Sequence, residues 1–123
     1  MENENTIAAQ AAPLTSTAAI AALAALAQES RLAVFRLLVQ AGPQGMAATK
    51  IAEALAIAPS SLSFHLKELA HANLVTASKA GRSIIYAAHY AGMNGLLAFL
   101  TENCCAGAPC CISEPNLLKD ITP

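Results

Sequence analysis

The spacing of apolar residues along the chain predicts mainly helical structure. Between residues 15 and 28, large apolar side chains recur about every three residues, which places them on one stripe of a first helix. Hydroxyl side chains at 15–17 can cap its first turn. The stripe consists of Ile20, Leu23 and Leu26 or Ala27.

A second helix is expected to begin at a cap formed by Ser30 and to end at Gly42-Pro43, because glycine and proline terminate helices. Its two arginines, Arg31 and Arg36, fall on the wetter side of the helix. The apolar face predicted for the core contains Leu32, Phe35, Leu38 and Val39.

Two further helices separated by a tight turn are predicted next. A short helix over 48–55 leads into the turn Ala56-Ile57-Ala58, and Pro59 opens a helix that runs to about Asn73. One side of the later helix is apolar, and the other presents short hydroxyls, one aromatic ring and one cation. This is the arrangement of a helix-turn-helix motif that enters a major groove. The inward leucines are Leu62, Leu66 and Leu69, and the exposed residues are Ser60, Ser61, Ser63, Phe64 and Lys67.

Two β-prone runs, 74–79 and 83–89, follow and are joined by Lys79-Ala80-Gly81-Arg82. The glycine supplies the conformation that a hairpin turn requires. Such a hairpin is typical of a wing, in which Lys79 and Arg82 would lie beside phosphates or in the neighbouring minor groove. A surface hairpin with ordinary solvated charges is the alternative for this segment taken alone. Helices and hairpin together predict a mainly α fold of the winged helix-turn-helix class.

Composition and charge indicate one small domain. The chain has 123 residues and a formal net charge of -1, so it has no global basic field. Residues 46–89 are nevertheless mildly basic, with four cations and two carboxylates. The longest apolar run, 18–27, is about half of a membrane span, so a cytoplasmic protein with no membrane contact is expected. We divide the chain into a flexible arm at 1–14, a DNA-binding and dimerisation domain at 15–103, and a cysteine-bearing tail at 104–123.

All four cysteines lie in one short window, as the pairs Cys104-Cys105 and Cys110-Cys111. Thiolates are soft ligands, so the window suits a thiophilic ion. Structural disulfides are one alternative, but residues 1–4 lack the basic start of a secretory signal, and bonding adjacent cysteines strains the peptide between them. Buried inert thiols are another, but the neighbouring Glu, Asn, Gly and Pro residues make a poor core. The pattern favours a metal or metalloid site.

Four segments together resemble the ArsR/SmtB family of winged-helix repressors: Ile51–Leu55, Ser60–Leu69, Ala72–Val75 and Gly81–Tyr86. The resemblance covers roughly residues 18–100. It implies a homodimer joined by the first and last helices, which binds an inverted repeat in double-stranded operator DNA. It also implies repression of metal or metalloid resistance operons, relieved when the ion binds. The residues expected at the DNA are Ser60, Ser61, Ser63, Phe64, His65, Lys67, Lys79 and Arg82.

Ligand positions vary within that family, and two known arrangements do not fit this chain. Ala47 and Thr49 stand where some members carry Cys-x-Cys. Residues 90–100 contain no carboxylate or histidine for a zinc site of the last-helix type, and His89 is expected to be an ordinary half-buried imidazole. The cysteine window instead resembles a subgroup of arsenic(III)-responsive members.

As(III) and Sb(III) favour three thiolates in a trigonal pyramid, and we expect Cys104, Cys105 and Cys111 to supply them. Adjacent side chains at a frayed helix end diverge by about 100°, so residues 106–109 are expected to fold the third sulfur back. Cys110 is a weaker ligand candidate: a spare, an alternative third ligand, or the fourth arm of a tetrahedral zinc or cadmium site. The inducer is expected to be As(III) or Sb(III), with no organic cofactor.

The apolar residues of the last helix can pack against a partner subunit and against the first helix, and plain core packing is the alternative. A thiol redox switch and a cadmium or zinc sensor on the same fold remain alternative functions. A metal carrier without a DNA role would leave the serine-bearing helix and the basic hairpin unexplained. No enzyme is expected, because the sequence shows neither an anion cradle nor Cys-x-x-Cys. The last-helix residues are Met93, Leu96, Leu97, Phe99 and Leu100.

Overall fold

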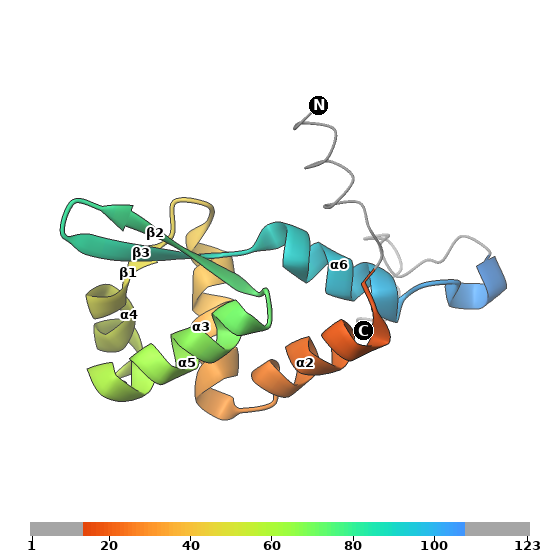
Figure 1. Cartoon of the computed structure of the whole chain (residues 1–123), viewed down its shortest axis with the longest axis horizontal. Helices are drawn as coiled ribbons and strands as arrows, with labels where there is room; N and C mark the ends of the chain where they lie inside the picture. Colours follow the sequence, from red (N-terminus) through yellow and green to blue (C-terminus); the bar gives the residue numbers. More distant parts are fainter. Residues whose placement is uncertain (1–13, 108–123) are drawn as a thin grey trace, which may run out of the picture.

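The computed structural model describes residues 14–107, which form a helical body with a three-stranded antiparallel sheet at one side (Figure 1). Residues 1–13 of the predicted arm at 1–14 and residues 108–123 of the predicted tail at 104–123 therefore lie outside the described residues. The elements are α2 (Ser16–Leu26), α3 (Glu29–Ala41), β1 (Met46–Ala47), α4 (Ala48–Leu55), α5 (Pro59–His71), β2 (Val75–Ala80), β3 (Ser83–Ala88), α6 (Tyr90–Leu100) and the 3-10 turn η1 (Cys104–Gly107).

The helix-turn-helix and hairpin predictions are confirmed at the level of these elements. The short helix occupies 48–55 as expected, and α5 begins at Pro59 and ends two residues before the predicted Asn73. β2 and β3 pair in antiparallel fashion from Val75↔Ala88 to Ala80↔Ser83, which leaves Gly81 and Arg82 as the turn. Gly81 adopts a φ of 64°, the left-handed conformation for which the turn needs a glycine.

The strand β1 was not predicted. It pairs with β3 through Met46↔Tyr86 and Ala47↔Ile85, so the strand order is β1-β3-β2. Two residues cannot display a periodic pattern, and only the pairing with a distant segment makes them a strand. This pairing fastens the start of α4 to the hairpin.

The core is built mainly from the aliphatic faces of α3, α4 and α5. The predicted leucines of α5 are buried, and Ile51 of α4 is fully buried. In α3 the prediction of Leu32 is wrong: its side chain is 44% exposed, while Val34 is completely buried. The two positions lie about 160° apart around a helix, and α3 packs with the Val34, Phe35 and Leu38 side inward.

The predicted cap of α3 is also wrong. Gln28 is the N-cap, and its side-chain oxygen accepts a hydrogen bond of 2.8 Å from the backbone N–H of Arg31. Ser30 lies within the first turn of the helix. The break between α2 and α3 is therefore only two residues long, from Ala27 to Gln28.

Helix α2 buries alanines, and two of its three large apolar side chains point outward. Ala19, Ala22 and Ala25 are buried, while Ile20 is 65% exposed and Leu23 is 43% exposed. The small alanine side chains let α2 pack against α3 and α5 at close range. Of the stripe predicted from the sequence, Leu26 is half-buried and packs against the core, whereas Ile20 and Leu23 lie outside the core of the single protomer.

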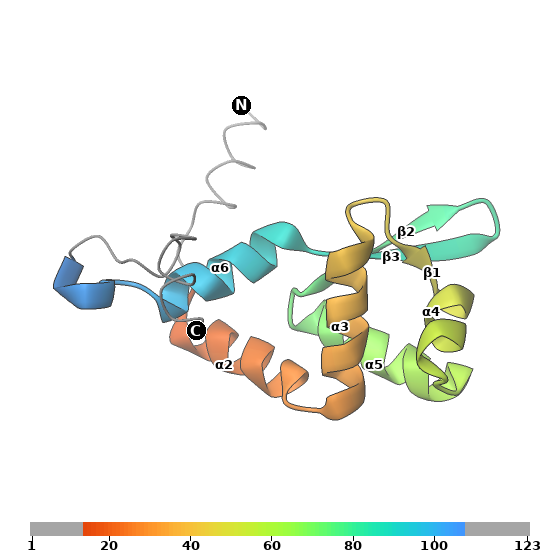
Figure 2. The same cartoon turned by 180° about the vertical axis from the view of Figure 1, so that it is seen from behind.

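Helices α2 and α6 lie side by side at one end of the molecule, and the β2–β3 hairpin extends at the other (Figure 1 and Figure 2). Leu96 is buried between α6 and the body. Within residues 14–107, no single helix is long and apolar enough to cross a membrane; α2 and α3 meet that test only as a pair, by length and composition, across a bend of 100°.

Candidate nucleic-acid interface and thiolate cluster

The turn between α4 and α5 is short because Ala56 adopts the left-handed conformation, with φ 54° and ψ 46°. Its backbone N–H bonds back to the last turn of α4, and Pro59 then occupies the first turn of α5. Proline is suited to that position because its missing N–H would have no partner there. The turn sets α5 across α4 with its N-terminal half at the surface.

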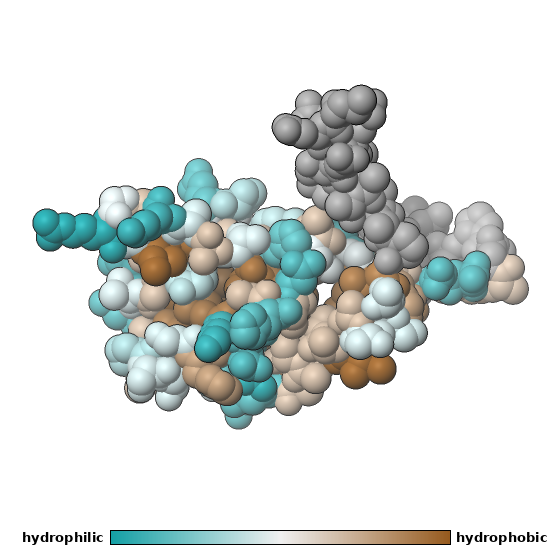
Figure 3. Space-filling model, in the orientation of Figure 1, coloured by the Kyte–Doolittle hydropathy of each residue, from teal (hydrophilic) through white to brown (hydrophobic). Residues whose placement is uncertain are grey.

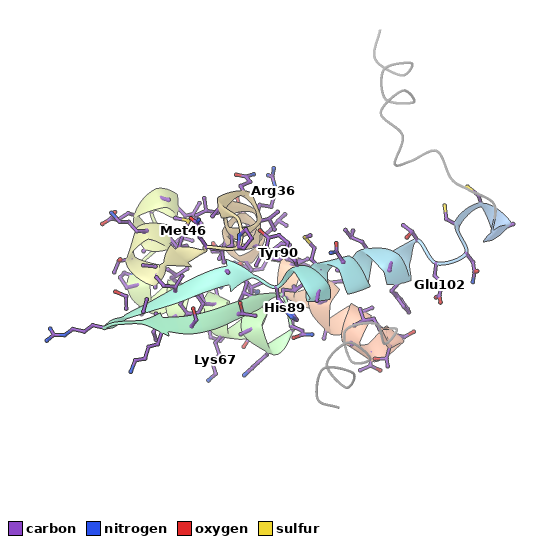
Figure 4. All side chains as sticks on the ribbon, turned by 90° about the horizontal axis from the view of Figure 1, so that it is seen from above. Arg36, Met46, Lys67, His89, Tyr90 and Glu102 are labelled. Atoms are coloured by element: carbon purple, nitrogen blue, oxygen red, sulfur yellow. The ribbon has the colours of Figure 1, made fainter. Side chains whose placement is uncertain are left out.

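The N-terminal half of α5 presents a continuous exposed face of small hydroxyls, one ring and one cation. Leu62 and Leu66 are buried on the opposite face. Phe64 is 55% exposed, so this aromatic side chain contributes little to the protomer core. Lys67 projects from α5 away from the body (Figure 4). The structure brings together five of the predicted contacts here: Ser60, Ser61, Ser63, Phe64 and Lys67, all exposed.

His65 is oriented differently from these five residues. It is half-buried, and its Nδ1 lies 3.5 Å from Nη1 of Arg31 on α3. Its ring also meets the ring of Phe64 edge-on, with centroids 5.9 Å apart. His65 therefore lies between α5 and α3, and a direct DNA contact by it stays a prediction.

The hairpin carries cations at its tip. Lys79 and Arg82 are both exposed, and hydrophilic side chains project at this end of the molecule (Figure 3). Ile84, which pairs with Lys79 across the two strands, is 45% exposed and was not selected by the sequence reasoning. Its only signal was its position two residues after the turn, where an apolar side chain has no core to enter.

The two described cysteines follow the end of α6. Thr101 caps that helix and donates a hydrogen bond of 2.8 Å from its hydroxyl to the carbonyl of Leu97. Beyond it, Cys104 is half-buried and Cys105 is exposed, and their Sγ atoms lie 3.6 Å apart. This is well beyond the covalent S–S length of about 2.05 Å.

The side chains of Cys104 and Cys105 do not diverge as adjacent side chains on a helix would. Cys105 has left-handed backbone angles, φ 58° and ψ 38°, because the chain has left the α-helix. The change in backbone direction brings the neighbouring sulfurs together. Cys110 and Cys111 lie outside the described residues, and among residues 14–107 no group of three His, Cys, Asp or Glu side chains is arranged to hold a metal ion.

His89 makes a contact within the fold. Its Nδ1 lies 3.0 Å from the carbonyl oxygen of Asn73, so Nδ1 carries the proton and donates. The bond joins the start of α6 to the end of α5. This is the behaviour expected of a half-buried structural imidazole.

A set of exposed apolar side chains lies where α2 and α6 meet, and we call it the α2–α6 face. Two members come from each helix, and all are more than two-fifths exposed. Hydrophobic atoms gather at this end of the molecule (Figure 3). In the protomer these side chains remain in contact with water, which disfavours core packing as their role. The face consists of Ile20, Leu23, Leu97 and Leu100.

A family model described as a helix-turn-helix domain matches residues 26–76. No match was found among curated proteins. Among solved structures, an ArsR-like transcriptional regulator from Rhodococcus sp. RHA1 superposes with a TM-score of 0.63 and 26% identity, covering 86% of this chain and 93% of that chain.

Two other solved structures are similar. One, described as a possible transcriptional regulator for arsenical resistance, has a TM-score of 0.57 and 25% identity over 82% of this chain and 95% of that chain. The other is the homodimeric winged helix-turn-helix DNA-binding domain Mb0332 from Mycobacterium bovis, with a TM-score of 0.55 and 21% identity over 84% and 87%. These likenesses confirm the winged helix-turn-helix fold.

Proposed function

From the premise that the chain carries a helix-turn-helix domain and is similar to ArsR-like transcriptional regulators, we propose that it is a repressor that binds operator DNA. The observation that carries the proposal is the exposed N-terminal half of α5 beside a cationic hairpin. Serine hydroxyls can bond base edges or phosphates, and the exposed Phe64 ring can contact a thymine methyl. Lys67, Lys79 and Arg82 supply the positive charge for the phosphates.

The repressor acts as a homodimer in this proposal. The α2–α6 face is the supporting observation, since a second copy would remove its apolar side chains from water. Two-fold symmetry of such a dimer matches an inverted repeat, with one α5 helix in each half-site. The site of action is then the cytoplasm, where the operator DNA lies.

Two classes of substitution should separate backbone contacts from base contacts. Arg82→Ala is expected to weaken binding to all sequences similarly and to reduce the salt dependence, because it removes a phosphate partner. Ser63→Ala and Phe64→Ala are expected to change the preference between operator variants, by about 1 to 3 kcal/mol per altered base pair. Fluorescence anisotropy on a panel of single-base operator variants measures both effects.

Arg36→Ala is the matched control, because Arg36 is exposed but points away from the side of the body on which Lys67 lies (Figure 4). It removes the same charge and should leave affinity nearly unchanged. If Arg36→Ala and Arg82→Ala weakened binding equally, the hairpin would have no special role. If Phe64→Ala left every operator preference intact, α5 would not be the reading helix.

We further infer that the repressor senses a metalloid, As(III) or Sb(III), through Cys104, Cys105 and Cys111. Support comes from the first two sulfurs, which at 3.6 Å are close enough to share one ion. Two thiolates bound at about 2.3 Å to a tetrahedral zinc ion would lie about 3.8 Å apart, so the pair also suits zinc or cadmium. A similar solved structure is described as a possible regulator for arsenical resistance.

The decisive experiment titrates the reduced protein on its own upstream DNA with arsenite, and separately with zinc, cadmium and peroxide. Arsenite is expected to lower operator affinity by about 5 to 150-fold, the range of a typical allosteric coupling energy. The double variant Cys104→Ser, Cys105→Ser should bind DNA normally and fail to respond. Cys110→Ser serves as the comparison and should keep most of the response.

Each of the other possible results would indicate a different sensing mechanism. Release by peroxide with formation of a disulfide, and indifference to arsenite, would make the cysteines a redox switch. Release by zinc or cadmium that is lost in Cys110→Ser would indicate a four-thiolate site. A double variant that still left DNA on arsenite addition would exclude the cysteine pair from sensing.

A further inference from the structure

A groove runs between α2 and the C-terminal half of α5, remote from the cysteines. Its volume is about 340 Å³, and a smaller hollow of about 110 Å³ that shares Ala21, His71 and Ala72 continues it. The α2 side is lined by alanines, which carry no atom beyond Cβ and so leave the space open. The groove is lined by Ala21, Ala24, Ala25, Arg31, Glu68 and His71.

The groove contains opposite charges that do not neutralise each other. Arg31 is half-buried; its Nε donates to the carbonyl of Ala25 at 2.8 Å, and its Nη1 lies 3.5 Å from His65. A guanidinium has five N–H donors, so three remain uncommitted. Glu68 is half-buried too, and within residues 14–107 its carboxylate makes no hydrogen bond or ion pair.

We propose that this groove binds a small zwitterion with a carboxylate, an ammonium group and an apolar side chain, that is, a free amino acid. Arg31 would receive the carboxylate in a two-bond contact, and Glu68 would receive the ammonium. The apolar part would lie on the alanines of α2. A simple anion would meet repulsion from Glu68 and a simple cation repulsion from Arg31, whereas a zwitterion satisfies both half-buried charges.

Most of the groove faces away from the surface proposed to join two copies. Around α2, Ala21 and Ala25 lie roughly 100° to 160° from Ile20 and Leu23, which belong to the α2–α6 face, whereas Ala24 lies on the side nearer to Ile20. A bound carboxylate would also engage the guanidinium that contacts His65, and His65 touches Phe64 on the exposed face of α5. Occupancy is thereby connected to the helix proposed to read DNA, although the binding itself does not depend on DNA.

The test is a titration of the whole protein, without DNA, with L-leucine and two analogues that each lack one of its charged groups. 4-Methylpentanoate lacks the ammonium, and 3-methylbutylamine lacks the carboxylate. Calorimetry should show binding of L-leucine at least roughly tenfold tighter than of either analogue, as expected for the loss of one charge-assisted contact. Amide NMR shifts should concentrate at Ala21, Ala24, Glu68 and Ala72.

Two pairs of variants tie the binding to the groove. Arg31→Gln and Glu68→Gln should each weaken L-leucine binding by roughly tenfold or more. Arg36→Gln and Glu53→Gln remove the same charges from exposed positions outside the groove and should leave it unchanged. Circular dichroism checks that each variant is folded. If Arg31→Gln disturbs the α2–α3 junction, the comparison of Glu68→Gln with Glu53→Gln still tests the proposal.

The same NMR titration is repeated with each of the twenty common amino acids. The proposal is overturned if none of them shifts the groove amides, or if 4-methylpentanoate binds as well as L-leucine. It is equally overturned if the exposed-site variants lose as much affinity as the groove variants. None of these results bears on operator binding, which the anisotropy experiments measure separately.

Discussion

Replacement of Leu97 by aspartate is expected to convert the protein to monomers and to lower operator affinity by roughly 10²-fold or more, the scale of the gain from linking two binding modules. Leu97 is 52% exposed in the protomer, so the substitution should not disturb folding. In the proposed dimer it would place a charge in an apolar contact, which is strongly unfavourable. Light scattering after size-exclusion chromatography measures the mass, and anisotropy measures the affinity.

Leu32→Asp is the matched control for this experiment. Leu32 is a similarly exposed leucine, at 44%, but it lies on α3 and outside the α2–α6 face. This variant should remain dimeric. A Leu97→Asp protein that stayed dimeric with unchanged DNA affinity would show that the two copies associate through another surface, and the α2–α6 face would need another occupant.

The second large effect is expected from Gly92→Ala. Gly92 lies in the first turn of α6, where that helix passes the end of α5. A Cβ at this position would overlap the backbone carbonyl of Asn73 and approach Nδ1 of His89 to 2.8 Å. It would therefore disrupt the hydrogen bond that joins α6 to α5. We expect a loss in the free energy of unfolding of about 1 to 3 kcal/mol, the usual cost of overpacking.

Gly95→Ala provides the comparison within the same helix. Apart from its chain neighbours and the backbone of α6 itself, no described heavy atom lies within 4 Å of the Cβ that it adds, so only the helix propensity changes. It should stabilise the protein by up to about 1 kcal/mol. Urea denaturation of both variants at one protein concentration checks the contrast, since the proposed dimerisation would make stability depend on concentration. Equal stability of the two variants would mean that α6 can move away from α5 without cost.

The sequence was most informative where one face of an element packs on the core. The heptad-like leucines at 62, 66 and 69 specify which side of α5 is inward, and the exposed serines, Phe64 and Lys67 follow from that orientation. The hairpin followed equally well from its turn glycine. In both cases a local pattern contains the whole signal, because the residue period and the turn chemistry are properties of the segment itself.

Features that depend on distant contacts were not predictable in the same way. Alanine fits any helix face, so the sequence contains no signal that Ala19, Ala22 and Ala25 are buried while Ile20 is exposed. The groove also exists because α2 presents alanines where larger side chains would fill the space. No sequence motif marks such a groove. The approach of Cys104 to Cys105 depends on a left-handed backbone conformation after α6. The ligand set of the cysteine window remains a prediction, because Cys110 and Cys111 lie outside the described residues.

The hairpin tip and η1 lie at opposite ends of an elongated protomer (Figure 1). In a dimer joined at the α2–α6 face, the cysteines would lie near the two-fold axis and the hairpins at the periphery. In such a dimer each protomer would act as a lever, and a slight tilt at the axis would displace the distant tip in proportion to the length of the protomer. Because half-sites are spaced by whole turns of about 34 Å, such a tilt would put both tips out of step with the DNA helix while the contacts at the axis stayed intact.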